Sequence, residues 1–149
     1  MKIQEHYKFH GAALTQIVQH PSFTALNKLD GKFGHYQINT NIRVLVKYRS
    51  NSESPWQFNF NSSDINTLRS DFKTGDKVFL CLVCGDKTIC AIDEEKIKQL
   101  FDLASKSQQY IRAEVPKGGS IWLRSSIGAI KGCIPHKDYP DILFNTGIA

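Results

Sequence analysis

Apolar residues recur along this chain at two spacings, one typical of helices and one typical of strands. Between His10 and His20 they form a single helical stripe, made of Ala13, Leu14, Ile17 and Val18. This stripe predicts a first helix. Pro21 is expected to end it, because proline lacks an amide hydrogen and restricts the residue before it.

A second, shorter helical pattern follows the proline. Ser22 is expected to cap it, and the apolar residues Phe23, Leu26 and Leu29 recur at helical spacing. Asp30-Gly31 and Gly34 are predicted to close this unit, because glycine readily ends a helix.

A β-hairpin is predicted next, from His35 to Ile38 and from Ile42 to Arg49, with Asn39-Thr40-Asn41 as the turn. Side chains alternate between the two faces of a strand. The second strand should therefore present Val44, Val46 and Tyr48 on one face, and Arg43, Leu45, Lys47 and Arg49 on the other.

The middle of the chain alternates strand and helix patterns. Trp56 to Phe60 predicts a strand with one apolar face, and Ser62 or Ser63 is expected to cap a helix that carries Ile65, Leu68 and Phe72. Val78 to Cys84 is continuously apolar, which favours a central strand buried on both faces. A tight turn leads into Thr88 to Ile92, and Asp93 is expected to cap a helix that buries Ile97, Leu100, Phe101 and Ala104.

The last third of the chain reads as β-structure. Strands are expected over Tyr110 to Val115, Ser120 to Arg124 and Ile127 to Ile134, and Ile142 to Phe144 is expected to pack the end of the chain. This order of elements predicts a mixed α/β (α+β) layered domain over residues 1–149, with a central mixed sheet flanked by helices. Residues 109–144 would be a C-terminal β extension.

The composition is that of one globular domain. The 149 residues are 41% hydrophobic and 22% charged, which excludes a disordered chain and a coiled coil. No apolar run approaches the ~20 residues of a membrane helix, and no apolar segment follows the charged start of the chain. We therefore expect a cytoplasmic protein without a signal peptide or a membrane partner.

The positive charge is unevenly distributed. The net charge is +5, and residues 1–50 carry seven Lys and Arg against two acids, whereas residues 51–100 carry six against eight. Arg43, Lys47 and Arg49 share one face of the predicted hairpin strand. Such a row is a candidate contact for a nucleic-acid backbone, and the alternative is the solvated face of an ordinary sheet.

The order of elements from residue 8 to 92 adds a family resemblance. An opening helix, a hairpin whose second strand ends in Val44-Leu45-Val46-Lys47-Tyr48-Arg49, a strand Trp56-Gln57-Phe58, a helix and the strand Val78 to Cys84 follow one another. This arrangement resembles the core of the PD-(D/E)XK restriction-endonuclease-like superfamily. In that family, acidic residues hold Mg²⁺ and a lysine helps to activate or position the attacking water.

Carried onto this chain, the resemblance makes Lys47 the motif lysine and Gln57 a polar site residue, and it places the hairpin acid near Asn39 or Asn41. Leu45 stands where the family has an acid. Mg²⁺ requires carboxylate oxygens, so the resemblance implies a nuclease-like domain whose metal site has decayed. Lys47, Gln57 and Asn41 are its candidate catalytic positions.

Four cysteines are present, at positions 81, 84, 90 and 133. The pair Cys81 and Cys84 superficially suggests zinc, but residues three apart in a strand point to opposite faces. Three of the four cysteines sit in strand-like apolar sequence, which favours buried, reduced thiols over a disulfide framework or a metal site.

Three functions are consistent with these features. The first is a catalytically degenerate nuclease-like domain that binds DNA through Arg43, Lys47 and Arg49. The second is a non-enzymatic interaction subunit or homo-oligomer. The third is an active Mg²⁺-dependent endonuclease with acids from other positions, such as Glu5, Asp30 or Asp64.

Overall fold

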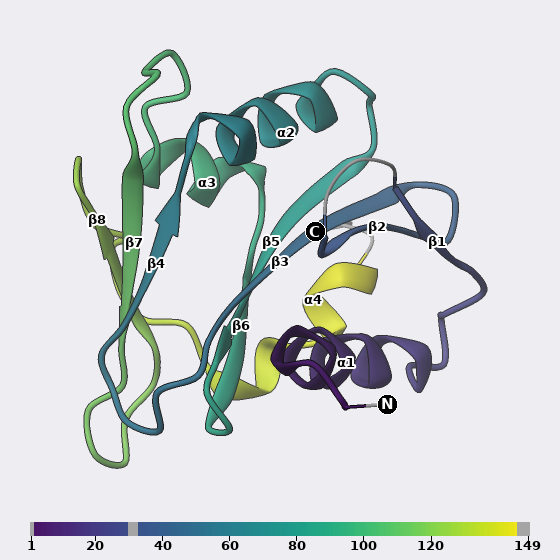
Figure 1. Ribbon diagram of the computed structural model, residues 1–149, viewed down its shortest axis with the longest axis horizontal. Coiled ribbons are helices and arrows are strands. Elements are labelled where there is room, and N and C mark those ends of the chain that lie inside the picture. Colours follow the sequence, from purple (N-terminus) through teal and green to yellow (C-terminus); the bar gives the residue numbers. More distant parts are fainter. Residues whose placement is uncertain (1, 30–32, 146–149) are drawn as a thin grey trace.

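Two β-sheets lie side by side in the computed structural model, which describes residues 2–29 and 33–145 (Figure 1). The larger sheet has five strands in the order β1-β2-β3-β5-β6, namely Leu26–Lys28, His35–Ile38, Ile42–Arg49, Lys77–Cys84 and Thr88–Ile92. The smaller sheet has three strands in the order β4-β7-β8, namely Trp56–Phe60, Gln109–Glu114 and Trp122–Ser125. Strands β3 and β5 are parallel, and the other neighbouring pairs are antiparallel. The predicted mixed α+β fold in a single domain is confirmed.

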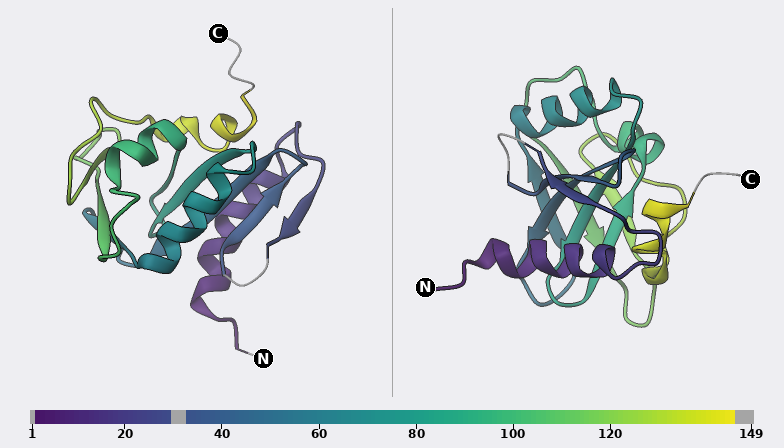
Figure 2. Two further views of the ribbon diagram at one scale, coloured as in Figure 1. Left: turned by 90° about the horizontal axis from the view of Figure 1, so that it is seen from above. Right: turned by 90° about the vertical axis from the view of Figure 1, so that its right-hand side faces the viewer.

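Helices cover both faces of the larger sheet (Figure 2). Helix α1 (Glu5–Val18) packs on one face, together with the short helices η1 (His136–Asp138) and α4 (Asp141–Phe144). Helices α2 (Ser62–Phe72) and α3 (Glu94–Leu100) pack on the other face, between the two sheets. Within the described residues, no helix is long and apolar enough to cross a membrane.

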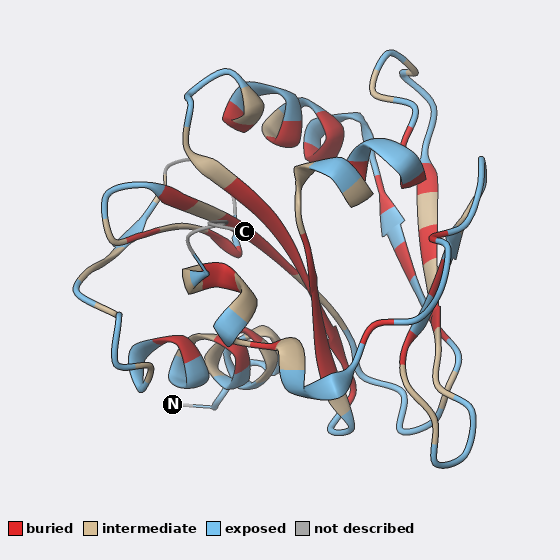
Figure 3. Ribbon diagram, turned by 180° about the vertical axis from the view of Figure 1, so that it is seen from behind, coloured by how far each residue is buried: buried red, intermediate tan, exposed pale blue. Residues whose placement is uncertain are grey.

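Strand β5 lies between the two halves of the core (Figure 3). Its residues Leu80, Leu82 and Cys84 pack into the cluster between the sheets. Phe79, Cys81 and Val83 pack into the cluster beneath α1. The continuous apolar sequence is therefore explained, because both faces of the strand are buried, and the predicted central strand is confirmed.

Several predicted elements are confirmed with small shifts of their ends. The hairpin forms as expected, and Asn39 adopts the positive φ of 55° that its turn requires. Trp56 to Phe60 is a strand with alternating buried and exposed residues. Asp93 caps α3 by accepting a hydrogen bond from the backbone N–H of Lys96.

The predicted second helix is wrong. Residues 26–28 form the edge strand β1, in which Leu26 pairs with Ile38. The side-chain oxygen of Asn39 accepts hydrogen bonds from the backbone N–H groups of Thr24 and Ala25, at 2.7 and 3.2 Å. This tertiary contact holds the segment extended and overrides its helical spacing. The predicted closure at Asp30-Gly31 lies outside the described residues.

Three further details differ from the prediction. Asn61, not Ser62 or Ser63, caps α2, because its side chain accepts from the N–H of Asp64. Helix α3 ends at Leu100, so Ala104 lies beyond it and is exposed. Residues 127–134 form only isolated bridges, at Ala129 and Ile134, instead of a strand.

Candidate functional site

Strand β3 presents its cations to helix α2. Arg43 pairs with Val78 and Lys47 with Leu82 in the register with β5, and both residues share the face of buried Leu45. Because α2 packs on this face, the two cationic side chains lie under a helix instead of in open solvent. Their side chains are 23% and 28% exposed.

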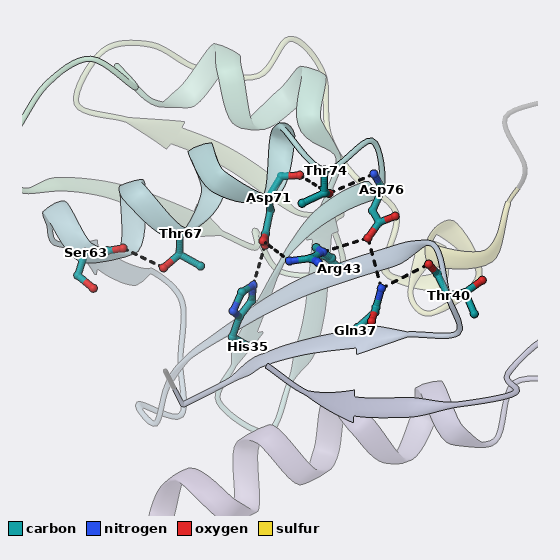
Figure 4. A network of polar contacts seen from close by, with 9 residues as sticks. All are labelled: His35, Gln37, Thr40, Arg43, Ser63, Thr67, Asp71, Thr74 and Asp76. Carbon is teal, nitrogen blue, oxygen red and sulfur yellow. Dashed lines mark hydrogen bonds and ion pairs between the residues drawn. The ribbon is translucent and has the colours of Figure 1, made fainter. Parts of the chain in front are cut away.

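Arg43 is held by two carboxylates, Asp71 in the last turn of α2 and Asp76 in the loop that follows the helix (Figure 4). Its Nη1 lies 3.1 Å from Oδ1 of Asp71, and its Nε lies 3.0 Å from Oδ2 of Asp76. Burial works against the charged form, but the hydrogen bonds to Asp76 and Asp71 outweigh it and raise the pKa of the guanidinium. Arg43 is therefore a fixed cation whose charge is compensated inside the protein.

The same network includes polar residues of strand β2. Nε2 of His35 lies 2.7 Å from Oδ2 of Asp71, a carboxylate that is almost fully buried. Gln37 donates to Asp76 and to the carbonyl of Thr40. An open cleft of about 450 Å³ adjoins this network, and α2 lines its other side with Ser63, Thr67 and Ser70. The network thus ties the end of α2 to β2 and β3.

Lys47 makes a separate ion pair at the start of α2. Its Nζ lies 3.2 Å from Oδ2 of Asp64, whose side chain is 4% exposed. The same carboxylate accepts from the backbone N–H of Asn61 at 3.1 Å, which completes a capping box. Nζ also lies 5.2 Å from the centre of the Phe60 ring. Lys47 therefore fixes the first turn of α2 against β3.

This arrangement does not fit Mg²⁺. A magnesium site takes carboxylate oxygens in octahedral geometry. The described residues contain no cluster of three or more His, Cys, Asp or Glu side chains that suits a metal ion. Asp64, the carboxylate beside Lys47, already accepts from the lysine and from the cap of its own helix.

The other residues that the sequence selects lie elsewhere. Asn41 is an exposed turn residue, roughly 20 Å along β3 from Lys47, and its carbonyl accepts from the N–H of Lys77. Gln57 is exposed on β4 in the smaller sheet. Arg49 is exposed at the end of β3. The structure does not bring Asn41 or Gln57 to Lys47.

Gln57 belongs instead to the solvent-facing side of the smaller sheet, which we name the polar-aromatic face. Register places Gln57 beside Arg112 and Arg112 beside Arg124, in one row across three strands. Cross-strand partners point to the same face of a sheet. The polar-aromatic face therefore comprises Gln57 and Asn59 from β4, Tyr110, Arg112 and Glu114 from β7, and Trp122 and Arg124 from β8.

A shared carboxylate orients the two arginines of this face. Oε1 of Glu114 lies 3.1 Å from Nε of Arg112 and 3.1 Å from Nη2 of Arg124. Within the described residues, no other carboxylate pairs with either guanidinium. Each guanidinium has five N–H donors, so both retain donors for a ligand. The three side chains together carry one net positive charge.

Aromatic side chains flank these arginines. Trp122 pairs with Glu114 across the strands, and 47% of its surface is exposed. Tyr110 lies beside Asn59 and is half-buried. The inward residues of the same strands, such as Trp56, Ile111 and Leu123, are buried in the core. The inner face of the smaller sheet is thus apolar and its outer face is polar and aromatic, because successive side chains along a strand point to opposite faces.

Sequence reasoning did not find the polar-aromatic face. The sequence predicts a strand over residues 110–115, but nothing local indicates that this strand pairs with residues 56–60. Comparisons with protein-family models, with curated proteins and with solved structures find no match to this chain. The function is therefore inferred from the arrangement of the residues themselves.

The cysteines do not form a site. Cys81 packs beneath α1, whereas Cys84 and Cys90 pack between the sheets, so the predicted divergence of Cys81 and Cys84 is confirmed. Burial raises the pKa of both the Cys81 and the Cys84 thiol to about 12. Cys133 is exposed and unbonded to another cysteine.

Proposed function

We propose that this protein binds nucleic acid without cleaving it, and that the polar-aromatic face is the main contact surface. The observation that carries the proposal is the row Gln57, Arg112 and Arg124 beside the exposed ring of Trp122. Guanidinium groups bind phosphate oxygens in paired geometry, and exposed rings stack on bases. The face thus offers partners for both components of a nucleotide.

Charge complementarity supports this choice of partner. The polar-aromatic face carries two arginines and one glutamate, and the protein as a whole has a net charge of +5. Helices α2 and α3 cover only the inner face of the smaller sheet, which is the face opposite the polar-aromatic face (Figure 1). A partner can therefore reach all three strands from solvent.

The hairpin cations have unequal roles in this proposal. Arg43 and Lys47 pair with Asp71 and Asp64 of α2, and Arg43 also pairs with Asp76 in the loop after it, so their charges are already compensated. Arg49 is the exposed cation of β3 and is a secondary contact. In this proposal the domain is a nuclease-like core whose metal site has decayed. Lys47 then stabilises the fold and has no catalytic role.

Binding of labelled oligonucleotides, measured by fluorescence anisotropy between low and moderate salt, tests the proposal. The double variant R112A/R124A should weaken binding at least about 10-fold and reduce the slope of log K against log salt by about 1 to 2. The matched control R69A/K73A removes the same charge from exposed positions in and just after α2, and it should bind like the wild type.

Two results would overturn the proposal. One is the absence of salt-dependent binding to DNA or RNA at low ionic strength. The other is an equal loss of affinity in both double variants, since that would indicate attraction by net charge without a defined surface. Intact plasmid after incubation with Mg²⁺ is expected, and cleavage that K47A abolishes would contradict the non-catalytic assignment.

A further inference from the structure

We infer that the polar-aromatic face is built for single-stranded nucleic acid, with an unpaired base stacked on Trp122. This inference rests on the proposed function and specifies its ligand. Three properties of the face support it: the exposed indole, the position of the arginines between aromatic residues, and the paired amides.

The indole of Trp122 is a large apolar surface left in solvent. It lies on strand β8 at the edge of the smaller sheet, 47% exposed, while the other tryptophan, Trp56, is 1% exposed and donates its Nε1–H to the carbonyl of Asn51. Leaving an aromatic ring in water forgoes the free energy of its burial. A base that stacks on Trp122 would bury this surface, and stacking accepts any base.

The arginines lie between two aromatic residues. Trp122 faces Glu114 of β7 across the strands. Tyr110 precedes Glu114 by four residues on the same strand, which corresponds to roughly 13 Å. Arg112 is midway between these positions, and Arg124 is its neighbour on β8. A flexible strand could thus place bases on the two rings and the intervening phosphate on the arginines.

The amides provide contacts to the edge of an unpaired base. Gln57 and Asn59 are exposed on β4, and their side chains lie within 3.4 Å of each other (Nε2 to Oδ1). An amide both donates and accepts, so it can bond the edge of a base. In a duplex the Watson–Crick edges are paired and the remaining edges lie in the grooves, which admit a two-stranded ribbon but not the face of a three-stranded sheet.

A duplex would therefore use only part of the polar-aromatic face. It could contact the guanidinium groups of Arg112 and Arg124 through its phosphates, but it would leave Trp122 without a stacking partner. This difference predicts that the protein prefers a single strand to a duplex of the same length, and that the preference depends on the indole.

The test measures binding of four probes of equal length and mixed sequence: single-stranded DNA, single-stranded RNA, and the duplex of each. We expect each single strand to bind at least about 10-fold more tightly than its duplex. Binding should also quench the fluorescence of Trp122. The variant W122A should lose about 5- to 100-fold in affinity for single strands and little for duplexes, whereas W122F should retain most of the affinity.

Controls separate this inference from the proposed function. Phe33 is 72% exposed and lies outside the polar-aromatic face, so F33A should bind like the wild type. If duplexes bind as tightly as single strands and R112A/R124A still weakens binding, the inference is wrong and the proposed function stands. If W122A binds single strands like the wild type, the inference is also wrong. If no probe binds, both fail.

Discussion

Lys47 on strand β3 lies 3.2 Å from Asp64 on helix α2, so the lysine that the sequence marks as a motif residue serves to hold a helix. The pair is partly buried, and Asp64 also closes the capping box of α2. One contact therefore joins the larger sheet to the first turn of the helix that covers it.

Replacing Lys47 should destabilise the fold. K47M removes the cation beside a carboxylate that is only 4% exposed, and we expect a loss of about 1–3 kcal/mol in the free energy of unfolding. Urea denaturation measures it. K98M is the matched control: Lys98 pairs with Glu94 on the surface, so this variant should lose less than about 0.5 kcal/mol. Equal losses in the two variants would contradict a structural role for Lys47.

Replacing Arg43 should cost more than replacing Lys47. R43A removes the cation that two carboxylates share, one of them 2% exposed, and the expected loss is about 3–5 kcal/mol. R43K should be intermediate, because an ammonium cannot reproduce the two-pronged contact with Asp71 and Asp76. R49A, at the exposed end of the same strand, should change stability by less than about 0.5 kcal/mol. Urea denaturation should show that the loss in the free energy of unfolding decreases in the order R43A, R43K, R49A.

These ion pairs change the meaning of the charge distribution. The cation excess lies in residues 1–50 and the acid excess in residues 51–100. Arg43 and Lys47 from the first segment meet Asp64, Asp71 and Asp76 from the second. The sequence correctly places the three hairpin cations on one strand face. It does not reveal that α2 covers this face, because that requires knowing which helix packs on which strand.

Local pattern predicts most elements of the fold, and tertiary contacts decide the exceptions. The alternation in β4 and the continuous apolar run in β5 are strong local signals, and both predictions are confirmed. Phe23, Leu26 and Leu29 recur at helical spacing, but residues 26–28 are held as a strand by pairing with β2 and by the side chain of Asn39. The polar-aromatic face requires the pairing of residues 56–60 with 109–113, which no local signal specifies.

Stability should fall at mildly acidic pH because of His10. The pKa of His10 is lowered from its ordinary value of 6.5, mainly by burial and to a smaller extent by the nearby charges of His6 and Lys47. Between pH 6.5 and the lowered pKa, the unfolded chain binds more protons than the folded protein. The contribution of neutral His10 to the free energy of unfolding is therefore fully present above pH 6.5 and decreases as the pH drops toward the lowered pKa.

The variant H10Q should remove this part of the pH dependence. Thermal unfolding from pH 7.5 to 5 measures it, and the midpoint of H10Q should fall less steeply with decreasing pH than that of the wild type. His10 is almost fully buried, so H10Q is also expected to be less stable at neutral pH. Parallel curves for the two proteins would contradict the prediction, whatever their difference in absolute stability.

Thiol reactivity should report the two halves of the core. Burial raises the pKa of the Cys81 and Cys84 thiols to about 12 and that of Cys90 well above its ordinary value, so these groups remain protonated at pH 8 and out of contact with solvent. Cys133 is exposed. Brief treatment of the native protein with iodoacetamide should therefore modify Cys133, as located by mass spectrometry, and C133S should remain unmodified under the same conditions.

In denaturant all four cysteines should react, because their protection comes from packing. Rapid modification of Cys81 in the native state would show that α1 does not cover β5 as described, since Cys81 lies beneath that helix.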